Sequence, residues 1–295
     1  MKINLDKNSG FCWGVNRTIG TVEQIIEDNP GRQVYVLGEI IHNPKEQERL
    51  RQLGMKVLTH EELGGFKDDN AILIIRAHGE PPETYKKAEA LDVRLIDATC
   101  PLVKNLQESI RNYYEKGYQI VIYGKKDHPE VLGLRGVCND DCIVVSTVDE
   151  SIHMVDYNKK TALFSQTTMN GITYDAIRKN IEQRSNDVVQ TGQVERIFET
   201  KDTICKSVVD REKHLREFAG ENDSIIFVAG KNSSNGRSLF NMVKSLNDKS
   251  HFVEDITEID PNWFDGVKSI GVSGATSTPK WYLERTIEAI ERMIR

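Results

Sequence analysis

The sequence predicts an α/β fold made of three similar α/β units, with mainly parallel sheets arranged with pseudo-threefold symmetry around a central cavity. Three observations lead to this prediction. Short apolar runs of strand length alternate with segments whose apolar residues recur at helical spacing. Cys12, Cys100 and Cys205 each stand where such a run gives way to a helix. Polar loops at strand ends then follow each cysteine at similar intervals, which is the pattern of an internal repeat.

The intervals between these features are nearly constant. The first polar loops lie 30, 28 and 29 residues after the three cysteines, at His42, His128 and Ser234. The second loops lie 66, 67 and 72 residues after them, at His78, Thr167 and Ser277. We therefore expect one unit at 14–98, a second at 99–200, and a third at 201–295 that the N-terminal strand within 1–13 completes.

The expected elements alternate between strand and helix along the chain. In the first third they are a strand at 2–5, a helix that ends near Pro30, strands at 34–37, 55–58, 72–75 and 93–96, a helix at 44–53 and another beginning at Pro81. In the second they are helices at 101–116, 148–156 and 171–185, strands at 120–123, 143–145 and 162–164, and an irregular or strand segment at 187–204. In the last they are helices at 206–219, 237–247 and 279–294, and strands at 225–228, 251–254 and 269–272.

Cys100 shows the strand-to-helix junction most clearly. The apolar run Val93, Leu95 and Ile96 precedes it, and Pro101 follows it. Proline suits the first turn of a helix, where its missing N–H is not needed. The positive end of the helix dipole favours a thiolate at this position.

Composition and charge exclude several classes of function. The chain has 295 residues and a formal net charge of −6, which argues against non-specific nucleic-acid binding. No apolar run approaches the ~20 residues that cross a bilayer, so we expect no membrane association. Five cysteines are an odd number and predict metal or catalytic use rather than a disulfide framework. A cytoplasmic enzyme is the expectation.

The polar loops predict a site at the carboxyl ends of the strands, where parallel sheets bind ligands. Three thiolates on an iron–sulfur cluster or a zinc ion leave one metal position open, which is typical of a catalytic site. The remaining side chains suit an anion such as a diphosphate. They are His42, His78, His128, Glu130, Thr167, Ser233, Ser234, Asn235 and Ser277.

Each candidate also has a purely structural interpretation. A buried cysteine is usually a small hydrophobic residue, and Ser233–Asn235 are equally suited to capping helix 237–247. Glu130 is either a first-turn carboxylate favoured by the helix dipole or, in a dry cavity, a proton donor with a raised pKa. Cys138 and Cys142 have a spacing that can ligate metal, but the acidic sequence between them favours a solvent-exposed loop.

Eight short motifs together resemble one family. They are Gly10-Phe-Cys-Trp-Gly-Val15, His42-Asn43, Ala77-His-Gly79, Asp97-Ala-Thr-Cys-Pro-Leu-Val103, His128-Pro-Glu-Val131, Gln166-Thr-Thr168, Lys231-Asn-Ser-Ser-Asn235 and the loop with Ser277. Over nearly the whole chain the sequence resembles the 4-hydroxy-3-methylbut-2-enyl diphosphate reductases, which catalyse the last step of the methylerythritol phosphate route to isoprenoids.

The resemblance implies a cofactor, a substrate site and a reaction. It implies a [4Fe–4S] cluster held by Cys12, Cys100 and Cys205, with one open iron that takes the substrate hydroxyl. It assigns Glu130, Thr167 and His128 to catalysis. It assigns the diphosphate to His42, His78, His128, Thr167, Ser233, Ser234, Asn235 and Ser277. The implied reaction is a reductive dehydroxylation that yields isopentenyl and dimethylallyl diphosphate. We expect electrons from a ferredoxin or flavodoxin, because no Gly-x-Gly-x-x-Gly nucleotide motif follows a strand.

The chain departs from the family pattern at two places. Trp13 stands where the family often has alanine, which predicts a bulky group beside the cluster, and Val208-Val-Asp-Arg-Glu212 replaces the common Thr-Thr-Asn-Arg-Gln. Two other functions remain open from the residues alone. One is a cluster-dependent hydro-lyase, which needs no reductant. The other is a non-catalytic iron–sulfur or zinc sensor of a phosphorylated metabolite.

Overall fold

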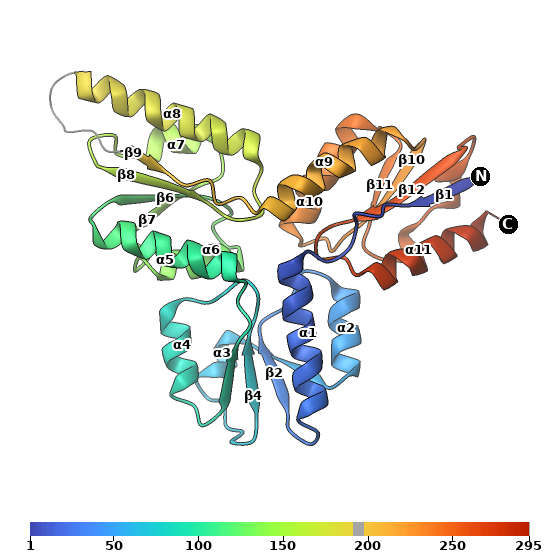
Figure 1. Cartoon of the computed structure of the whole chain (residues 1–295), viewed down its shortest axis with the longest axis horizontal. Helices are drawn as coiled ribbons and strands as arrows, with labels where there is room; N and C mark the ends of the chain where they lie inside the picture. Colours follow the sequence, from blue (N-terminus) through green and yellow to red (C-terminus); the bar gives the residue numbers. More distant parts are fainter. Residues whose placement is uncertain (191–197, 295) are drawn as a thin grey trace. The chain divides into compact units, whose positions relative to one another are not determined.

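The computed structural model describes residues 1–190 and 198–294. Its contacts divide the chain into two compact parts. We call Leu58–Cys205 the continuous unit. We call Met1–Val57 with Lys206–Arg295 the discontinuous unit, because the continuous unit interrupts it. Within the described residues the strands form three four-stranded sheets, and helices lie between successive strands (Figure 1).

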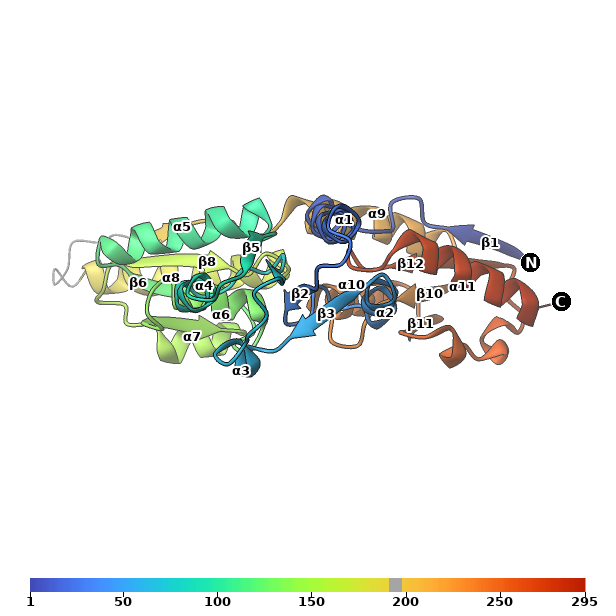
Figure 2. The ribbon, with the colours of Figure 1, turned by 90° about the horizontal axis from the view of Figure 1, so that it is seen from below.

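The sheet at the centre of the continuous unit has the strand order β7-β6-β8-β9. Its strands are β6 (Gln119–Tyr123), β7 (Cys142–Val145), β8 (Thr161–Ser165) and β9 (Phe198–Thr200), and all pair in parallel. The surrounding helices are α5 (Pro101–Glu115), α6 (Pro129–Gly136), α7 (Val148–Met154) and α8 (Gly171–Gln190). In Figure 2, α5 and α7 lie on opposite sides of β8.

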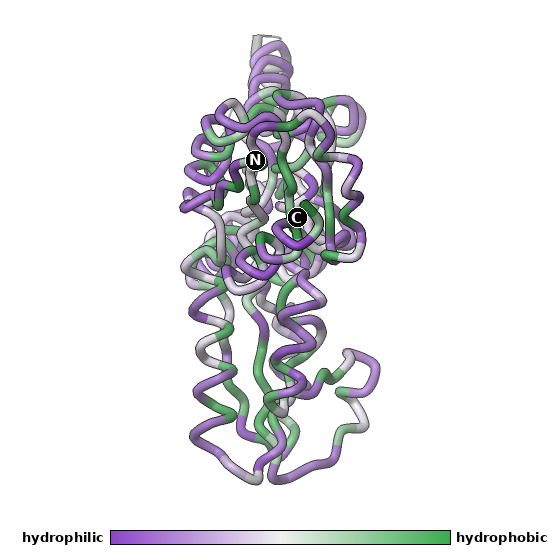
Figure 3. The backbone as a smooth tube through the Cα atoms, turned by 90° about the vertical axis from the view of Figure 1, so that its right-hand side faces the viewer, coloured by the Kyte–Doolittle hydropathy of each residue, from purple (hydrophilic) through white to green (hydrophobic). Residues whose placement is uncertain are grey.

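Strand alternation explains why both faces of this sheet are covered. Ile120 and Ile122 of β6 pack with residues of α5 and α6, whereas Val121 and Tyr123 pack with residues of α8. Successive side chains of a strand point to opposite faces, and a parallel sheet buried on both faces therefore has nearly continuous apolar strands. Figure 3 shows hydrophobic stretches of backbone beside helices whose hydropathy alternates along the chain.

The discontinuous unit contains a sheet of the same design, with the order β1-β12-β10-β11. Its strands are β1 (Lys2–Leu5), β10 (Ser224–Val228), β11 (Ser250–Val253) and β12 (Ser269–Gly274), and its helices include α9 (Lys206–Gly220), α10 (Ser234–Leu246) and α11 (Lys280–Met293). Two short 3₁₀ helices, Ile256–Glu258 and Pro261–Phe264, precede β12. The N-terminal strand pairs in parallel with β12, with Lys2 opposite Ser269.

The remaining sheet contains β2 (Val34–Leu37), β3 (Met55–Leu58), β4 (Ile72–Ile75) and β5 (Arg94–Asp97). β4 and β5 pair in parallel, with Ile75 opposite Asp97. The helices in this part of the chain are α1 (Trp13–Asp28), α2 (Pro44–Gln52), α3 (His60–Leu63) and α4 (Pro82–Glu89). The α/β class with three parallel sheets is confirmed. The boundaries at 14–98, 99–200 and 201–295, and the arrangement around a cavity, stay predictions.

Two predicted segments differ from the structure. α10 begins at Ser234 rather than 237, because the Ser233 hydroxyl accepts the Gly236 N–H and caps the helix earlier. α8 continues to Gln190, so residues 187–190 are helical rather than irregular or strand. The buried face of α8 explains the extension, because Ile177, Ile181 and Ser185 recur at four-residue spacing. The part of that predicted segment at 191–197 lies outside the described residues.

Candidate active site

The three candidate cysteines share one backbone contact. The N–H of Cys12 donates to the Thr276 carbonyl at 3.1 Å, that of Cys100 to Ala77 at 3.0 Å, and that of Cys205 to Thr167 at 2.8 Å. Each acceptor lies in the loop that follows the strand next to the one that delivers the cysteine. Each cysteine is thereby fixed beside a polar strand-end loop, at His78, Thr167 or Ser277. The spacing noted in the sequence corresponds to a repeated local structure.

Glu130 and Thr167 form the best-defined pair in the continuous unit. The Thr167 N–H donates to Glu130 Oε1 and its hydroxyl donates to Oε2, both at 2.7 Å. Glu130 is only 2% exposed, and burial raises its pKa to about 7, although the two bonds from Thr167 act in the opposite direction. Burial therefore leaves about half of this carboxylic acid protonated near neutral pH, in contact with a hydroxyl that can pass its proton on.

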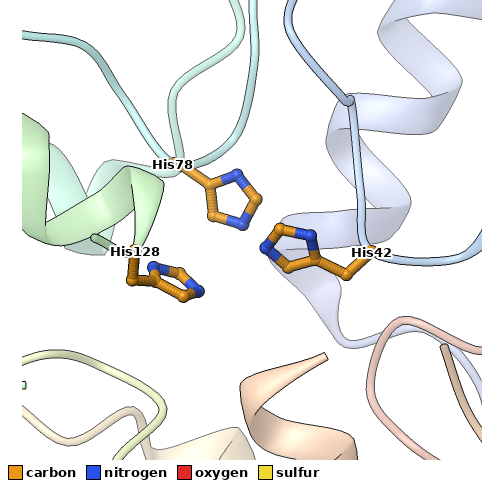
Figure 4. Close-up of side chains that lie close together, drawn as sticks. All are labelled: His42, His78 and His128. Carbon is orange, nitrogen blue, oxygen red and sulfur yellow. The ribbon is translucent and has the colours of Figure 1, made fainter. Parts of the chain in front are cut away.

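His128 is positioned by the same helix. It caps α6, and its Nδ1 accepts the Glu130 N–H at 3.1 Å. A neutral ring whose Nδ1 accepts a hydrogen bond carries its proton on Nε2. His78 lies edge-on to this ring, with the ring centroids 5.4 Å apart and the planes at 90°. Figure 4 shows the His78 and His128 side chains on the loops that follow β4 and β6. The two imidazoles can supply N–H donors to an anion.

Cys100 and Cys205 lie near each other in the continuous unit. Burial raises the pKa of the Cys100 thiol, and the neighbouring Cys205 and Glu130 raise it further. The nearby backbone N–H groups of Leu102 and Val103 act in the opposite direction. Two neighbouring half-buried thiols fit a bound metal centre, because a cation stabilises thiolates.

Cys12 occupies an equivalent position in the discontinuous unit. It is the N-cap of α1, and its sulfur accepts the Val15 N–H at 3.5 Å. Cys12 and Cys100 thus both stand at helix N-termini, and at Cys12 an amide donates to the sulfur, a contact that tunes metal–thiolate sites. Trp13, which we expected beside the metal as a bulky group, is the first residue of α1 and 62% exposed. Its side chain is therefore largely in solvent.

The loops after β10 and β12 form a cradle of donors in the same unit. Ser233, Ser234, Asn235 and Ser277 are all buried, and the Ser233 and Ser277 hydroxyl oxygens are 3.5 Å apart. Asn235 Oδ1 accepts both the N–H and the hydroxyl of Thr276, at 3.1 and 2.9 Å. Its buried Nδ2 has no hydrogen-bond partner among the described residues. A buried donor that lacks an acceptor, at the start of a helix, fits an anionic ligand.

His42 approaches this cradle through its backbone. It follows β2, and its Nδ1 lies 3.3 Å from Glu39 Oε2. A Cβ added at Gly230 would lie 2.2 Å from the His42 carbonyl oxygen, so only glycine permits this approach. The predicted residues thus form two groups. Cys12, His42, Ser233, Ser234, Asn235 and Ser277 lie in the discontinuous unit, and His78, Cys100, His128, Glu130, Thr167 and Cys205 in the continuous unit. That the two groups form one site stays a prediction.

Sequence reasoning missed a buried network that anchors the Cys12 loop. Arg211 of α9 donates to Asp6 Oδ2 at 2.8 Å, to the Ser273 hydroxyl at 2.6 Å and to the Gly274 carbonyl at 2.9 Å. Asp6 ends the N-terminal strand, and Ser273 lies in β12, which leads to Ser277. Burial lowers the Arg211 pKa, and the Asp6 carboxylate acts in the opposite direction. The available signal was Arg211 itself, which stands in the altered motif Val208-Val-Asp-Arg-Glu212, but its partners lie far away in sequence.

Comparisons with known proteins agree over the full chain. The family model described as LytB protein matches residues 3–291. The 4-hydroxy-3-methylbut-2-enyl diphosphate reductase of Bacteroides fragilis is 44% identical and that of Chloroherpeton thalassium 43%, with at least 96% of each chain covered.

Two solved structures are also similar. One is described as (E)-4-hydroxy-3-methyl-but-2-enyl diphosphate reductase, the terminal enzyme of the non-mevalonate pathway, with 34% identity and a TM-score of 0.69 over 100% of this chain and 99% of that one. The other is the E-1-hydroxy-2-methyl-but-2-enyl-4-diphosphate reductase of Plasmodium falciparum, with 26% identity and a TM-score of 0.84 over 97% and 87%. In the part of the chain that the structure describes, no helix combines the length and apolar character needed to cross a bilayer.

Proposed function

Because the chain belongs to the LytB protein family, we propose that it catalyses the reduction of 4-hydroxy-3-methylbut-2-enyl diphosphate, the terminal step of the non-mevalonate pathway. Two electrons and two protons enter, the C–O bond of the allylic hydroxyl breaks, and the oxygen leaves as water. The products are isopentenyl and dimethylallyl diphosphate. Ferredoxin or flavodoxin is the proposed electron donor, and the cytoplasm is the proposed location.

Cys12, Cys100 and Cys205 are the proposed ligands of a [4Fe–4S] cluster with one open iron. The family is one of iron–sulfur reductases, and the repeated strand-to-helix setting of the three thiols supports this ligand set. When bound, such a cluster supplies single electrons and a Lewis-acidic position for the substrate oxygen. The Val15 amide holds the Cys12 sulfur in place, and the start of α5 places Cys100 at a helix N-terminus.

The diphosphate is proposed to bind to neutral donors from both units. Ser233, Ser234 and Asn235 supply the start of α10, where backbone N–H groups and the helix dipole favour negative charge. Ser277 and His42 contribute from the loops after β12 and β2, and His78 and His128 contribute imidazole N–H groups. The donor on Asn235 supports this assignment most directly, because its amide nitrogen is buried without an acceptor.

Glu130 is the proposed proton source. At neutral pH its carboxyl group is about half protonated, because burial brings its pKa to about 7. When Glu130 is protonated, its Oε2–H donates to Thr167 Oγ1 across the same 2.7 Å contact, and the threonine hydroxyl proton is then directed at the ligand. The proton reaches the leaving hydroxyl through Thr167, with His128 holding the first turn of α6 in position.

The buried Glu130–Thr167 contact is the observation that carries the catalytic proposal. Glu130→Gln keeps the shape and still accepts the Thr167 N–H, but it cannot deliver a proton. We expect normal iron content and substrate affinity, with turnover reduced at least 100-fold, the range of general acid catalysis. Glu83→Gln is a matched control, because Glu83 follows a proline at the same place in α4 but has an exposed side chain.

The assay follows oxidation of a chemical one-electron reductant and separates the products by chromatography. Turnover of Glu130→Gln within threefold of the wild-type value would contradict the proton role. Turnover without any reductant would indicate a hydro-lyase instead. Tight binding of the diphosphate without conversion would indicate a sensor.

A further inference from the structure

The connection between α6 and β7 brings together two cysteines outside the proposed cluster site. Cys138 lies just after α6, and Cys142 is the first residue of β7. Both side chains pack against the same apolar cluster, and each lies near enough to shift the pKa of the other. The sequence favoured a solvent-exposed loop here, and for Cys138 that expectation is wrong. Cys138 is 0% exposed and packs among apolar residues of α5, β6 and β8, including Ile110, Ile120 and Phe164.

The backbone between the two cysteines explains their contact. Asn139 and Asp140 both adopt the left-handed conformation, with φ of 54° and 60°. Asparagine and aspartate tolerate this region better than other non-glycine residues. The Asp141 N–H donates to the Cys138 carbonyl at 2.9 Å, and the Arg135–Asp140 ion pair at 2.9 Å holds the turn. The chain therefore turns tightly between the two cysteines, and both side chains reach the same apolar cluster.

The two thiols differ in access. A cavity of about 560 Å³ within the continuous unit is lined by Cys142 but not by Cys138. Tyr118, Asp141, Met154 and Lys159 also line it. Cys142 is therefore accessible from this cavity, whereas Cys138 is fully buried.

The two thiols also differ in electrostatics. The neighbouring Cys138 thiol lowers the pKa of Cys142, Arg135 lowers it further, and burial, Asp140 and Asp141 act in the opposite direction. The neighbouring Cys142 and burial raise the pKa of Cys138. Its thiol also lies 3.2 Å from the Arg135 carbonyl oxygen. An accessible sulfur with a lowered pKa next to a buried protonated one is the arrangement of an attacking and a resolving cysteine.

We propose that Cys138 and Cys142 form a redox-active dithiol that closes an intramolecular disulfide by exchange with a low-molecular-weight disulfide. The pair is separate from Cys12, Cys100 and Cys205, and the inference does not depend on the proposed reductase activity. A buried cysteine that serves only as a small hydrophobic residue accounts for Cys138. It does not account for a second thiol held against the first by a strained turn.

The exchange proceeds in two steps. The Cys142 thiolate attacks one sulfur of the disulfide, forms a mixed disulfide and releases one thiol. Cys138 then loses its proton, attacks the Cys142 sulfur and releases the second thiol. Two cysteine thiols are oxidised by two electrons, and the small disulfide is reduced to two thiols. Among the described residues, no third histidine, cysteine or carboxylate joins the pair in a metal-binding group, so we prefer exchange to metal binding.

The test uses the metal-loaded, full-length protein under anaerobic conditions. The protein is equilibrated with stepped ratios of reduced glutathione to glutathione disulfide, quenched with acid and alkylated with N-ethylmaleimide. Peptide mass spectrometry then locates the modified cysteines. We expect Cys138 and Cys142 to lose alkylation together, as one peptide two hydrogens lighter, with bound iron unchanged. Excess reduced glutathione should restore both thiols.

Two variants separate the two steps of the exchange. Cys142→Ser should leave Cys138 reduced at every ratio, whereas Cys138→Ala should accumulate a mixed disulfide with glutathione on Cys142. If Cys138→Ala does not fold, the alkylation of Cys142→Ser and the peptide map of the wild-type protein still show whether the bridge forms. The proposal is overturned if both thiols stay reduced at every ratio. It is also overturned if wild-type Cys142 retains glutathione without forming the bridge, or if either cysteine bridges to Cys12, Cys100 or Cys205.

Discussion

The protonation of Glu130 can be tested by a change of pH combined with one substitution. With its usual pKa of 4.5, the carboxyl group at pH 7 would have about one acid molecule for every 300 carboxylates. With the raised pKa of about 7 the ratio is about one to one. Burial therefore raises the amount of available acid roughly 150-fold, equivalent to roughly 3 kcal/mol of differential interaction.

Turnover should follow the protonated fraction of Glu130. We expect it to be nearly constant below pH 6 and to fall about tenfold per pH unit above 7, where the acid form is depleted. The same shift acts on stability. Because the folded-state pKa is raised, the stability linked to this proton is fully present below pH 4.5 and is lost as the pH rises through about 7.

Thr167→Val supplies the directional test. The Thr167 hydroxyl lowers the Glu130 pKa, and so its removal should move the titration midpoint of Glu130 upward while the backbone N–H contact stays. Infrared difference spectra of wild type minus Glu130→Gln isolate the C=O stretch of the protonated acid across pH 5 to 9. Titration of this band near pH 4.5 would show that burial does not control the carboxyl group. A downward shift of the titration midpoint in Thr167→Val would show the same.

Three further changes test the scaffold and the anion cradle. Gly230→Ala places a Cβ against the His42 carbonyl, and thermal denaturation should show a loss of ~1–3 kcal/mol in the free energy of unfolding. Gly20→Ala is the control, because a Cβ there meets no atom within 4 Å. Arg211→Met leaves the Asp6 carboxylate buried without its partner and should cost ~3–5 kcal/mol by urea unfolding; a loss below 1 kcal/mol contradicts the network. Asn235→Asp replaces the donor by a negative charge, and calorimetry with inorganic diphosphate should show affinity at least tenfold weaker; unchanged affinity removes Asn235 from the cradle.

The local features of this fold could be predicted because their signals are contiguous in sequence. Apolar runs marked the strands, and Pro101 after Cys100 marked a strand-to-helix junction. The dry environment of Glu130 was only one of two interpretations, because burial depends on residues far along the chain. The Thr167 contact, 37 residues away, could not be derived from Glu130 itself.

The misjudged positions share one physical cause. Polar neighbours suggested that Cys138 was exposed, but the left-handed turn at Asn139 and Asp140 directs its side chain into the core. Arg211 was noted only as part of a motif, because an ion pair with Asp6 spans 205 residues. In both cases the tertiary fold, rather than local composition, determines burial.

The pairing of β1 with β12 has a consequence for the order in which the protein folds during synthesis. Lys2 leaves the ribosome first, but its partner Ser269 is made 267 residues later, on the order of tens of seconds at typical elongation rates. The Leu58–Cys205 segment is complete before Ser269 is made. The nascent N-terminal strand must therefore wait unpaired, and a chaperone that shields it should increase the yield of native protein more than one acting on the middle of the chain.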